Sequence, residues 1–303
     1  MNRTGIPLFV NPQAGTGPTG VDALRELFGA DVVAPEVVQP PELAARIKRA
    51  VKEGHEIIAV AGGDGSLRAA VNAIAGTTSS LAIVPAGTLN NFARRIGIDD
   101  LETARDAMVN GVAEPLSLGK VGDELFLNTL TFGEYARTVR IREKLRGFLT
   151  KWPAALVGFL TIVLTLRTFD VELEVEGKRV KRRTPFLWVG IGYGSFPRVD
   201  EASERRDSPD LEVAILHSRT PLATAGFMWR ASMQMLRNEY PVRDKALEVF
   251  HTRSLTLHTE RAFDGTSDGE LVRPPSPVHI CVHDDAVRIF RPTRSADEGN
   301  ATS

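Results

Sequence analysis

The sequence predicts an α/β protein of two domains, a parallel α/β domain followed by a mostly antiparallel one. Its 303 residues correspond to roughly two domains of about 150 residues. Residues 6–96 alternate short apolar runs with amphipathic segments, which is typical of βαβ units around a parallel sheet. From about Leu116 onward, strand-like segments follow one another with turns between them, which indicates antiparallel pairing.

The first domain is expected to alternate strands with helices. Its strands are predicted at 6–10, 31–38, 56–61 and 81–84, and its helices at 21–28, 41–52, 67–74 and from 91. The second domain is predicted to have strands at 116–121, 124–131, 169–176, 179–183, 186–191, 211–217, 247–252, 254–259, 271–272 and 278–282, and a last short strand is predicted at 287–290. Helical stretches are expected at 138–166 and 222–236, and a disordered tail at 295–303.

Composition and charge exclude several classes of protein. Hydrophobic residues make up 43% and charged residues 25%, so the chain is neither disordered nor collagen-like. The formal net charge is −1, so we expect no nucleic-acid partner. Cys281 is the only cysteine, which excludes an internal disulfide. The longest apolar run, Trp152–Leu166, is shorter than the roughly 20 residues of a membrane span, and Ile6–Val10 is too short for an export signal. We expect a cytoplasmic protein.

Three glycine-containing loops, at 11–17, 62–66 and 85–91, each follow a predicted strand and precede a helix. The carboxyl ends of parallel strands lie side by side and form the ligand crevice of an open sheet. Glycines let the backbone approach a phosphate closely, and helix N-termini add unpaired N–H donors. The three loops therefore predict a phosphate-binding site at one edge of the sheet.

Asp64 stands out among these donors because its carboxylate would repel a phosphate. A magnesium ion between the two would remove the repulsion. Asp64 alternatively caps the helix that begins near Leu67, which is a common role for Asp. Both interpretations stay open at this stage.

Two familiar phosphate-binding motifs do not explain the loops. The P-loop pattern G-x-x-x-x-G-K-[ST] is absent. A G-x-G-x-x-G string occurs at Gly15–Gly20, but the second half of the chain lacks the further βαβ units of a dinucleotide fold. A nicotinamide-dependent dehydrogenase is therefore disfavoured.

Taken together, the loops resemble the diacylglycerol kinase catalytic-domain family of lipid kinases, which includes sphingosine and ceramide kinases and to which NAD kinases are more distantly related. The motifs that carry the resemblance are Asn-Pro-Gln-Ala-Gly at 11–15, Gly-Gly-Asp-Gly-Ser at 62–66, Pro-Ala-Gly-Thr-Leu-Asn-Asn-Phe-Ala-Arg at 85–94, Phe-Leu-Asn at 126–128 and Asp-Gly-Glu at 268–270. The resemblance spans nearly the whole chain.

This resemblance implies an ATP-binding α/β nucleotide-binding domain at 1–117 plus 286–294, and a β-sandwich substrate domain at 118–285. It implies transfer of the γ-phosphoryl group of ATP to a lipid hydroxyl, with Mg²⁺ as cofactor and a lipid such as diacylglycerol as substrate. Glu270 would be the catalytic base and Asp64 a catalytic and magnesium-binding residue, and Asp207 would hold a second metal. The implied nucleotide-binding residues are Asn11, Gly15, Gly62, Gly63, Asp64, Gly65, Ser66, Arg68, Gly87, Thr88 and Asn90.

The chain departs from the family where Asn91 and Ser117 replace aspartates of the magnesium network. Two further hypotheses therefore stay open. One is an NAD-kinase-like enzyme acting on a soluble substrate, and the other is a catalytically weak protein that binds a nucleotide or a lipid.

Basic clusters at 137–151 and 178–183, the first leading into the apolar run 152–166, suit contact with an anionic bilayer at the inner membrane face. The alternatives are a core helix for the apolar run and protection of an edge strand by the charges at 178–183. The sequence leaves the oligomeric state open.

Overall fold

The computed structural model divides the chain into two compact units. Unit 1 comprises Met1–Leu118 and Asp284–Ser303, and unit 2 comprises Gly119–His283. The structure describes residues 5–13, 21–33, 35–88, 90–133, 168–191, 210–217, 220, 222–224, 226–227, 230, 245–259 and 264–292. The chain passes from one unit to the other within strand β5 (Val112–Val121) and again within strand β16 (Val278–Arg291).

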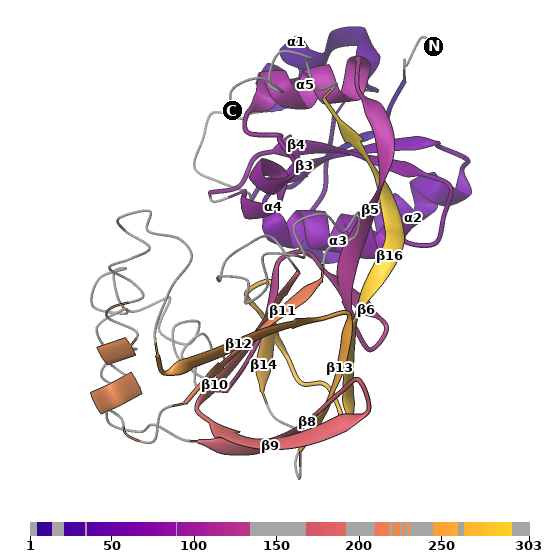
Figure 1. Ribbon diagram of the computed structural model, residues 1–303. Coiled ribbons are helices and arrows are strands. Elements are labelled where there is room, and N and C mark those ends of the chain that lie inside the picture. The colour runs from indigo at the N-terminus through magenta and orange to yellow at the C-terminus, as the bar shows by residue number, and fades with distance from the viewer. Residues whose placement is uncertain are drawn as a thin grey trace, which may run out of the picture. The chain divides into compact units, whose positions relative to one another are not determined.

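Unit 1 is built on parallel strands in the order β2-β1-β3-β4, followed by the second half of β16 (Figure 1). The strands are β1 (Leu8–Val10), β2 (Glu36–Val37), β3 (Ile57–Gly62) and β4 (Ser80–Pro85). The helices are α1 (Val21–Phe28), α2 (Pro40–Lys52), α3 (Asp64–Ile74), α4 (Asn91–Arg95) and α5 (Leu101–Val109), with a 3₁₀ turn η1 at Gly29–Asp31. Strand β4 is buried along its whole length, as a strand covered on both faces must be.

The strand order reverses direction between β1 and β3, because β2 lies on one side of β1 while β3 and β4 lie on the other. Such a reversal is the topological switch point at which open α/β sheets bind their ligands, outside the carboxyl ends of the strands. The loops after β1 and β3 flank this point.

Unit 2 contains two antiparallel layers with an apolar core between them. One is the six-stranded sheet β12-β11-β10-β7-β14-β15, and the other contains β16-β13-β8-β9. The strands are β6 (Glu124–Phe126), β7 (Thr129–Gly133), β8 (Phe169–Val175), β9 (Lys178–Thr184), β10 (Phe186–Ile191), β11 (Leu211–Leu216), β12 (Leu247–Thr252), β13 (Ser254–His258), β14 (Gly265–Ser267) and β15 (Glu270–Val272). Side chains such as Phe132 and Val189 of one sheet and Leu257 and Ile280 of the other form one buried cluster.

The predicted fold class is confirmed, whereas several element boundaries are wrong. The single strand predicted at 124–131 is two strands, β6 and β7, and the two predicted at 278–282 and 287–290 are one continuous strand, β16. Helix α5 and strand β14 are additional elements. The helix predicted at 138–166, most of the one at 222–236 and the tail at 295–303 lie outside the described residues. Within the described part of the chain, no helix is long and apolar enough to cross a membrane.

Candidate functional site

The three glycine-containing loops of unit 1 start at the same edge of the parallel sheet. Val10 of β1 lies level with Ala61 of β3, and Gly62 of β3 lies level with Pro85 of β4. The loop after β1 is fastened to the next one because the Asn11 side-chain amide donates to Ser66 Oγ at 2.7 Å. The first two loops therefore meet through side chains at the switch point.

The second and third loops meet backbone to backbone. A Cβ atom added to Gly87 would lie 2.4 Å from Gly63 Cα, which is closer than any real Cβ approaches another atom. A Cβ added to Gly62 would likewise lie 2.4 Å from Ser66 Cβ. These positions need glycine because a side chain would push the loops apart and fill the space where their backbones come together.

The third loop is shaped by Asn90, which adopts the left-handed conformation at φ 49° and ψ 40°. Its side chain accepts a hydrogen bond from Gly87 N at 2.8 Å and donates one to Gly87 O at 2.9 Å. Asn tolerates this backbone region better than most residues, and its short amide can bond to the local backbone. The Asn90 side chain therefore holds the loop in its turn.

The Asp64 carboxylate caps a helix, although not the one that the sequence suggested. It occupies the first position of α3, after the N-cap residue Gly63. Its two oxygens accept hydrogen bonds from the first backbone amides of α4, from Phe92 N at 2.9 Å and from Asn91 N at 3.2 Å. A carboxylate is stabilised at a helix N-terminus by these orphan donors and by the helix dipole. The interpretation of Asp64 as a cap of its own helix is thus wrong, and the side chain ties the second loop to the third.

The remaining predicted residues of this edge differ in accessibility. Gly65 and Thr88 are exposed, whereas the Arg68 side chain on α3 is buried with 8% of its surface exposed. Gly15 and Asp207 lie outside the described residues. Among the residues that the structure describes, no group of three or more His, Cys, Asp or Glu could hold a metal ion by itself. Beside nucleotides, Mg²⁺ is usually bound by one or two carboxylates together with phosphate oxygens and water.

In unit 2, the Asp-Gly-Glu motif forms the tight turn between β14 and β15. Asp268 and Gly269 both have positive φ, at 50° and 86°, which is the pattern of a two-residue type I′ hairpin. Glu270 follows as the first residue of β15 and is exposed. A carboxylate held at the end of a tight hairpin can reach a ligand while its backbone stays fixed.

The Asp268 carboxylate anchors this hairpin to the break between β6 and β7. It accepts hydrogen bonds from three consecutive backbone amides, Leu127 N at 2.7 Å, Asn128 N at 2.7 Å and Thr129 N at 3.0 Å. The sequence identifies Asp268 only as part of the Asp-Gly-Glu motif and does not predict this role. The Asp-Gly pair signals a hairpin, but the partner amides lie about 140 residues away in the chain.

The two positions that depart from the family pattern have other partners. Asn91 contributes its backbone amide to Asp64, as described above. Ser117 Oγ lies 3.3 Å from Asp284 Oδ1, so the hydroxyl donates to a carboxylate of β16. A carboxylate thus lies beside Ser117, although it comes from another strand.

The charges predicted at 178–183 belong to β9, the last strand in its sheet order. Arg179 lies 3.0 Å from Glu174, Lys181 lies 3.6 Å from Glu172 and Arg183 lies 4.0 Å from Asp170, all acids of the neighbouring β8. This pairing fits the protection of an edge strand, because charged side chains discourage pairing with another chain.

Comparison with known proteins agrees with this architecture. Residues 6–121 match the family described as diacylglycerol kinase catalytic domain. These residues belong to that family. The match covers the three loops and the start of the second unit, so the resemblance drawn from the motifs is confirmed.

Similar proteins extend the comparison along the chain. A diacylglycerol kinase of Bacillus subtilis (strain 168) is 27% identical over 246 residues, which are 77% of this chain and 80% of that protein. A Pseudomonas putida protein named "Probable lipid kinase YegS-like" is 34% identical over 151 residues, about half of each chain. A crystal structure from Bacillus anthracis, of a candidate diacylglycerol kinase, has a TM-score of 0.71 at 20% identity and covers 96% of this chain and 98% of its own. At that identity the likeness shows a shared fold.

Proposed function

We propose that this chain is an ATP-dependent lipid kinase that transfers the γ-phosphoryl group to the hydroxyl of a lipid such as diacylglycerol. The observation that carries the proposal is the meeting of three glycine-containing loops at the switch point of a domain from the diacylglycerol kinase family. The names of the relatives from Bacillus subtilis and Pseudomonas putida support a lipid acceptor.

The loops of unit 1 would hold the triphosphate of ATP. Because Gly63 and Gly87 carry no side chain, the second and third loops pack backbone to backbone, and backbone N–H groups of such loops can bind an anion at the edge where Asn11 and Ser66 also lie. The N-termini of α3 and α4 add dipoles that favour negative charge. These groups would act by orienting the transferred group and by stabilising its charge.

Asp64 fits a magnesium ion as well as the helix cap. Each of its oxygens accepts one backbone N–H bond, which leaves lone pairs for a cation or its water. Bound Mg²⁺ would neutralise charge on the β- and γ-phosphates. The cap would fix the direction of the carboxylate before the ion binds.

Glu270 is our candidate for the general base. As the lipid oxygen bonds to the γ-phosphorus, the bond to the β–γ bridging oxygen breaks and the hydroxyl proton passes to the Glu270 carboxylate. A carboxylate is a weak base for an alcohol, so proton transfer should accompany phosphoryl transfer rather than precede it. Asp268 would act as a positioning residue by holding the hairpin that carries Glu270.

A direct test uses ATP labelled in the γ-phosphate, with mixed lipid vesicles and NAD as competing acceptors. Label in the lipid fraction, dependent on Mg²⁺, is expected. Label in NAD alone would replace the proposal with an NAD-kinase-like activity. Nucleotide binding without label in any product would favour the catalytically weak protein that the replacements at Asn91 and Ser117 suggest.

The role of Glu270 is tested by Glu270→Gln, which keeps the shape of the side chain and removes the base. We expect a loss of turnover of about 10²–10⁴-fold, the usual contribution of general base catalysis, with an unchanged affinity for ATP. Turnover is measured with saturating lipid, and ATP affinity by equilibrium binding. Glu102→Gln, at another exposed glutamate, is the matched control and should keep full turnover. Equal turnover in the two variants would remove Glu270 from the mechanism.

A further inference from the structure

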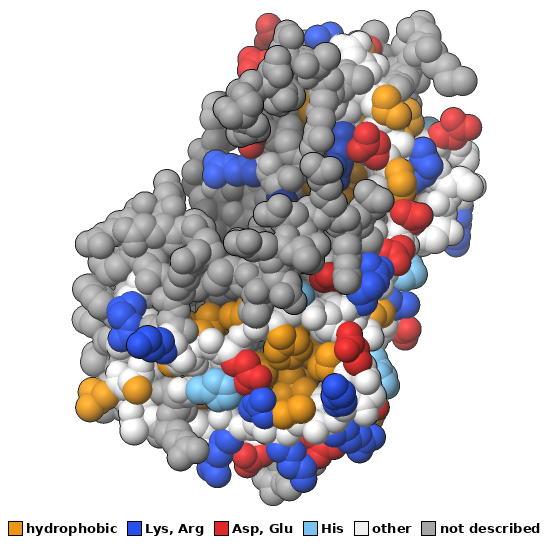
Figure 2. Space-filling view, in the orientation of Figure 1, with side chains coloured by type: hydrophobic (Ala, Val, Ile, Leu, Met, Phe, Trp, Pro, Cys, Tyr) orange, Lys and Arg blue, Asp and Glu red, His pale blue; other side chains and the backbone are white. Residues whose placement is uncertain are grey.

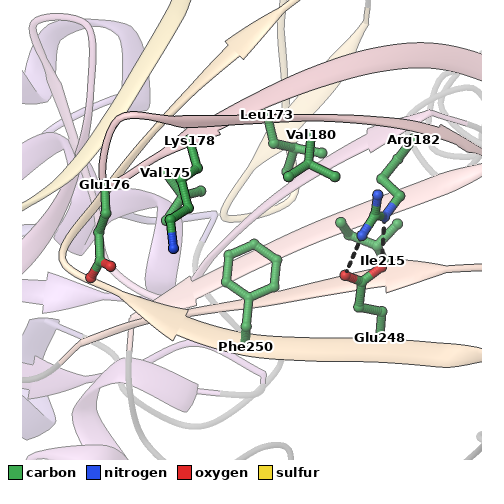
Figure 3. Close-up of a pocket in the computed structure, with 9 residues that line it drawn as sticks. All are labelled: Leu173, Val175, Glu176, Lys178, Val180, Arg182, Ile215, Glu248 and Phe250. Atoms are coloured by element: carbon green, nitrogen blue, oxygen red, sulfur yellow. Dashed lines mark hydrogen bonds and ion pairs between the residues drawn. The ribbon is translucent and has the colours of Figure 1, made fainter.

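A cavity of about 260 Å³ opens in unit 2 where the edge strands β9 and β12 of its two sheets face each other (Figure 3). The apolar part of its wall consists of Leu173, Val175, Val180, Ile215 and Phe250, and four charged residues complete the lining. Figure 2 shows hydrophobic side chains gathered in this region of the surface and bordered by charged side chains of both signs. The sandwich thus leaves part of its apolar interior open at this corner.

The opening follows from the sequence of β9, in which alternate residues face opposite sides of the sheet. Arg179, Lys181 and Arg183 pair with the acids of β8. The intervening residues Lys178, Val180 and Arg182 line the cavity. Val180 is the only apolar residue among these three, and it remains 40% exposed because the flanking charged side chains do not close the gap toward β12.

The charges at the two ends of the cavity are not equivalent. At one end, Arg182 and Glu248 form a bidentate pair at 2.8 and 2.9 Å, and His217 Nε2 lies 2.6 Å from the same carboxylate. At the other end lie Glu176 and Lys178, beside the β8–β9 turn. Among the described residues, Lys178 has no carboxylate within ion-pair distance, unlike the other four basic side chains of β9. Its ammonium is therefore available to an anionic head group that lies against Lys178, on the side away from the Glu176 carboxylate.

The size of the cavity limits its occupant. Since a methylene group fills about as much space as a water molecule, ~30 Å³, the cavity holds roughly nine such groups. That volume is slightly below the usual range for pockets that bind drug-sized ligands. It suits one unbranched alkyl chain.

The cavity is also separate from the hairpin that carries Glu270. It lies beside β12, whereas Glu270 begins β15, and these strands are the opposite edges of the six-stranded sheet. With neighbouring strands about 4.8 Å apart, five steps correspond to roughly 24 Å. A chain lying in the cavity would not place its head group at Glu270.

We propose that this cavity binds the alkyl chain of a single-chain anionic amphiphile of about eight to ten carbons, with the head group at Lys178. The apolar wall takes the chain, and the ammonium takes a carboxylate or a phosphate monoester. The site is distinct from that of the lipid acceptor and goes beyond the proposed kinase activity.

The test is calorimetric titration of the full chain with hexanoate, octanoate and decanoate, each below its micelle-forming concentration and without nucleotide. Because each buried methylene contributes about 0.8 kcal/mol, affinity should rise roughly fourfold per carbon up to decanoate. Decyltrimethylammonium should bind at least tenfold more weakly than decanoate. The affinities for decyl phosphate and decanoate are then compared. The tighter of the two shows whether the site prefers a phosphate monoester or the carboxylate of a fatty acid. Equal binding of the cationic compound, or no saturable binding of any compound, would overturn the proposal.

Variants locate the site. Val180→Trp should fill the cavity and Val180→Asp should make its wall polar, and each should weaken decanoate binding at least tenfold. Lys178→Glu should reverse the head-group preference, whereas Lys181→Glu makes the same charge change on the outward face and should not. Glu270→Gln should leave decanoate binding unchanged. The cavity proposal and the kinase proposal can therefore fail independently of each other. Decanoate binding that survives both Val180 variants would refute this location.

Discussion

At the scale of single residues, Asp64 has two roles that substitution can separate. Asp64→Asn weakens the cap of α4, because an amide nitrogen replaces one of the two acceptor oxygens, and the lost hydrogen bond should cost about 1 kcal/mol. If Asp64 also holds magnesium, kinase turnover should fall at least a hundredfold, and more Mg²⁺ should be needed for half-maximal rate. Thermal unfolding and a magnesium titration of the rate measure the two effects.

Asp100 provides the matched control for this substitution, because its side chain accepts from Thr103 N at 2.8 Å and caps α5 in the same unit. Asp100→Ala removes this cap at a residue with no proposed role in catalysis, and it should cost about 1 kcal/mol with full turnover. If Asp64→Asn lowers turnover no more than Asp100→Ala does, Asp64 is a cap alone.

Asp268 is the residue on which the geometry of Glu270 depends. Asp268→Ala removes the acceptor of three backbone amides and puts an alanine at φ 50°, so we expect a loss of roughly 2–4 kcal/mol in the free energy of unfolding. Asp268→Asn keeps the turn and should lose less. In both variants turnover should fall while ATP affinity holds. The control is Asp123→Ala, in the exposed turn between β5 and β6. If turnover in the Asp268 variants falls only in proportion to the fraction of unfolded protein, Asp268 does not position Glu270.

These residues can be predicted from the sequence, whereas their contacts cannot. The motifs around Asp64, Asn90 and Asp268 are local strings, and local strings indicate which residues matter. The partners of Asp64 are 27 and 28 residues away and those of Asp268 about 140, so the cap of α4 and the anchoring of the hairpin depend on tertiary packing. No spacing rule within one strand or helix contains that information.

At the scale of secondary structure, the edge strands β9 and β12 are joined by the Arg182–Glu248 pair, which makes stability depend on pH. The hydrogen bond from Arg182 lowers the pKa of the Glu248 carboxyl, and His217 adds to the effect. A lowered pKa in the folded state means that this stabilisation is present above the unfolded value, 4.5, and is lost as the pH falls through the folded pKa.

The expected size of that contribution is about 0.5–1 kcal/mol, because the pair is partly exposed to solvent. Glu248→Gln should therefore lower the melting temperature at pH 7 and have little effect near pH 3. Arg182→Gln and the double variant complete a cycle that isolates the pair. A melting-temperature difference that is the same at both pH values would show that the carboxylate charge contributes nothing.

The elements that were predicted wrongly share a physical cause. The break between β6 and β7 falls at Leu127 and Asn128, whose backbone amides bond to Asp268 instead of to a neighbouring strand. Strand β16 continues through Asp284 and Asp285, which lie between the two shorter strands predicted at 278–282 and 287–290. Helix α5 is short and only weakly amphipathic. In each case tertiary contacts outweigh local preference.

At the scale of the whole molecule, strand β16 belongs to both units, and its two halves should support them separately. Ile289 is fully buried and lies level with Leu81 of β4, whereas Ile280 is buried at 1% exposure and lies level with Leu255 of β13. Ile289→Ala and Ile280→Ala should each cost about 2–4 kcal/mol, the usual loss for a buried aliphatic truncation.

The consequences should differ by location, and amide hydrogen exchange can resolve them. Ile289→Ala should speed exchange in β3 and β4 of unit 1, and Ile280→Ala in β13 and β8 of unit 2, because local opening follows the contacts that a truncation removes. Both variants replace Ile by Ala in the same strand, so the change in β-strand propensity is the same in both and does not affect the comparison. Faster exchange throughout both units in either variant would mean that the chain opens as one cooperative body. The loss of stability at one half of β16 would then also destabilise the unit that contains the other half.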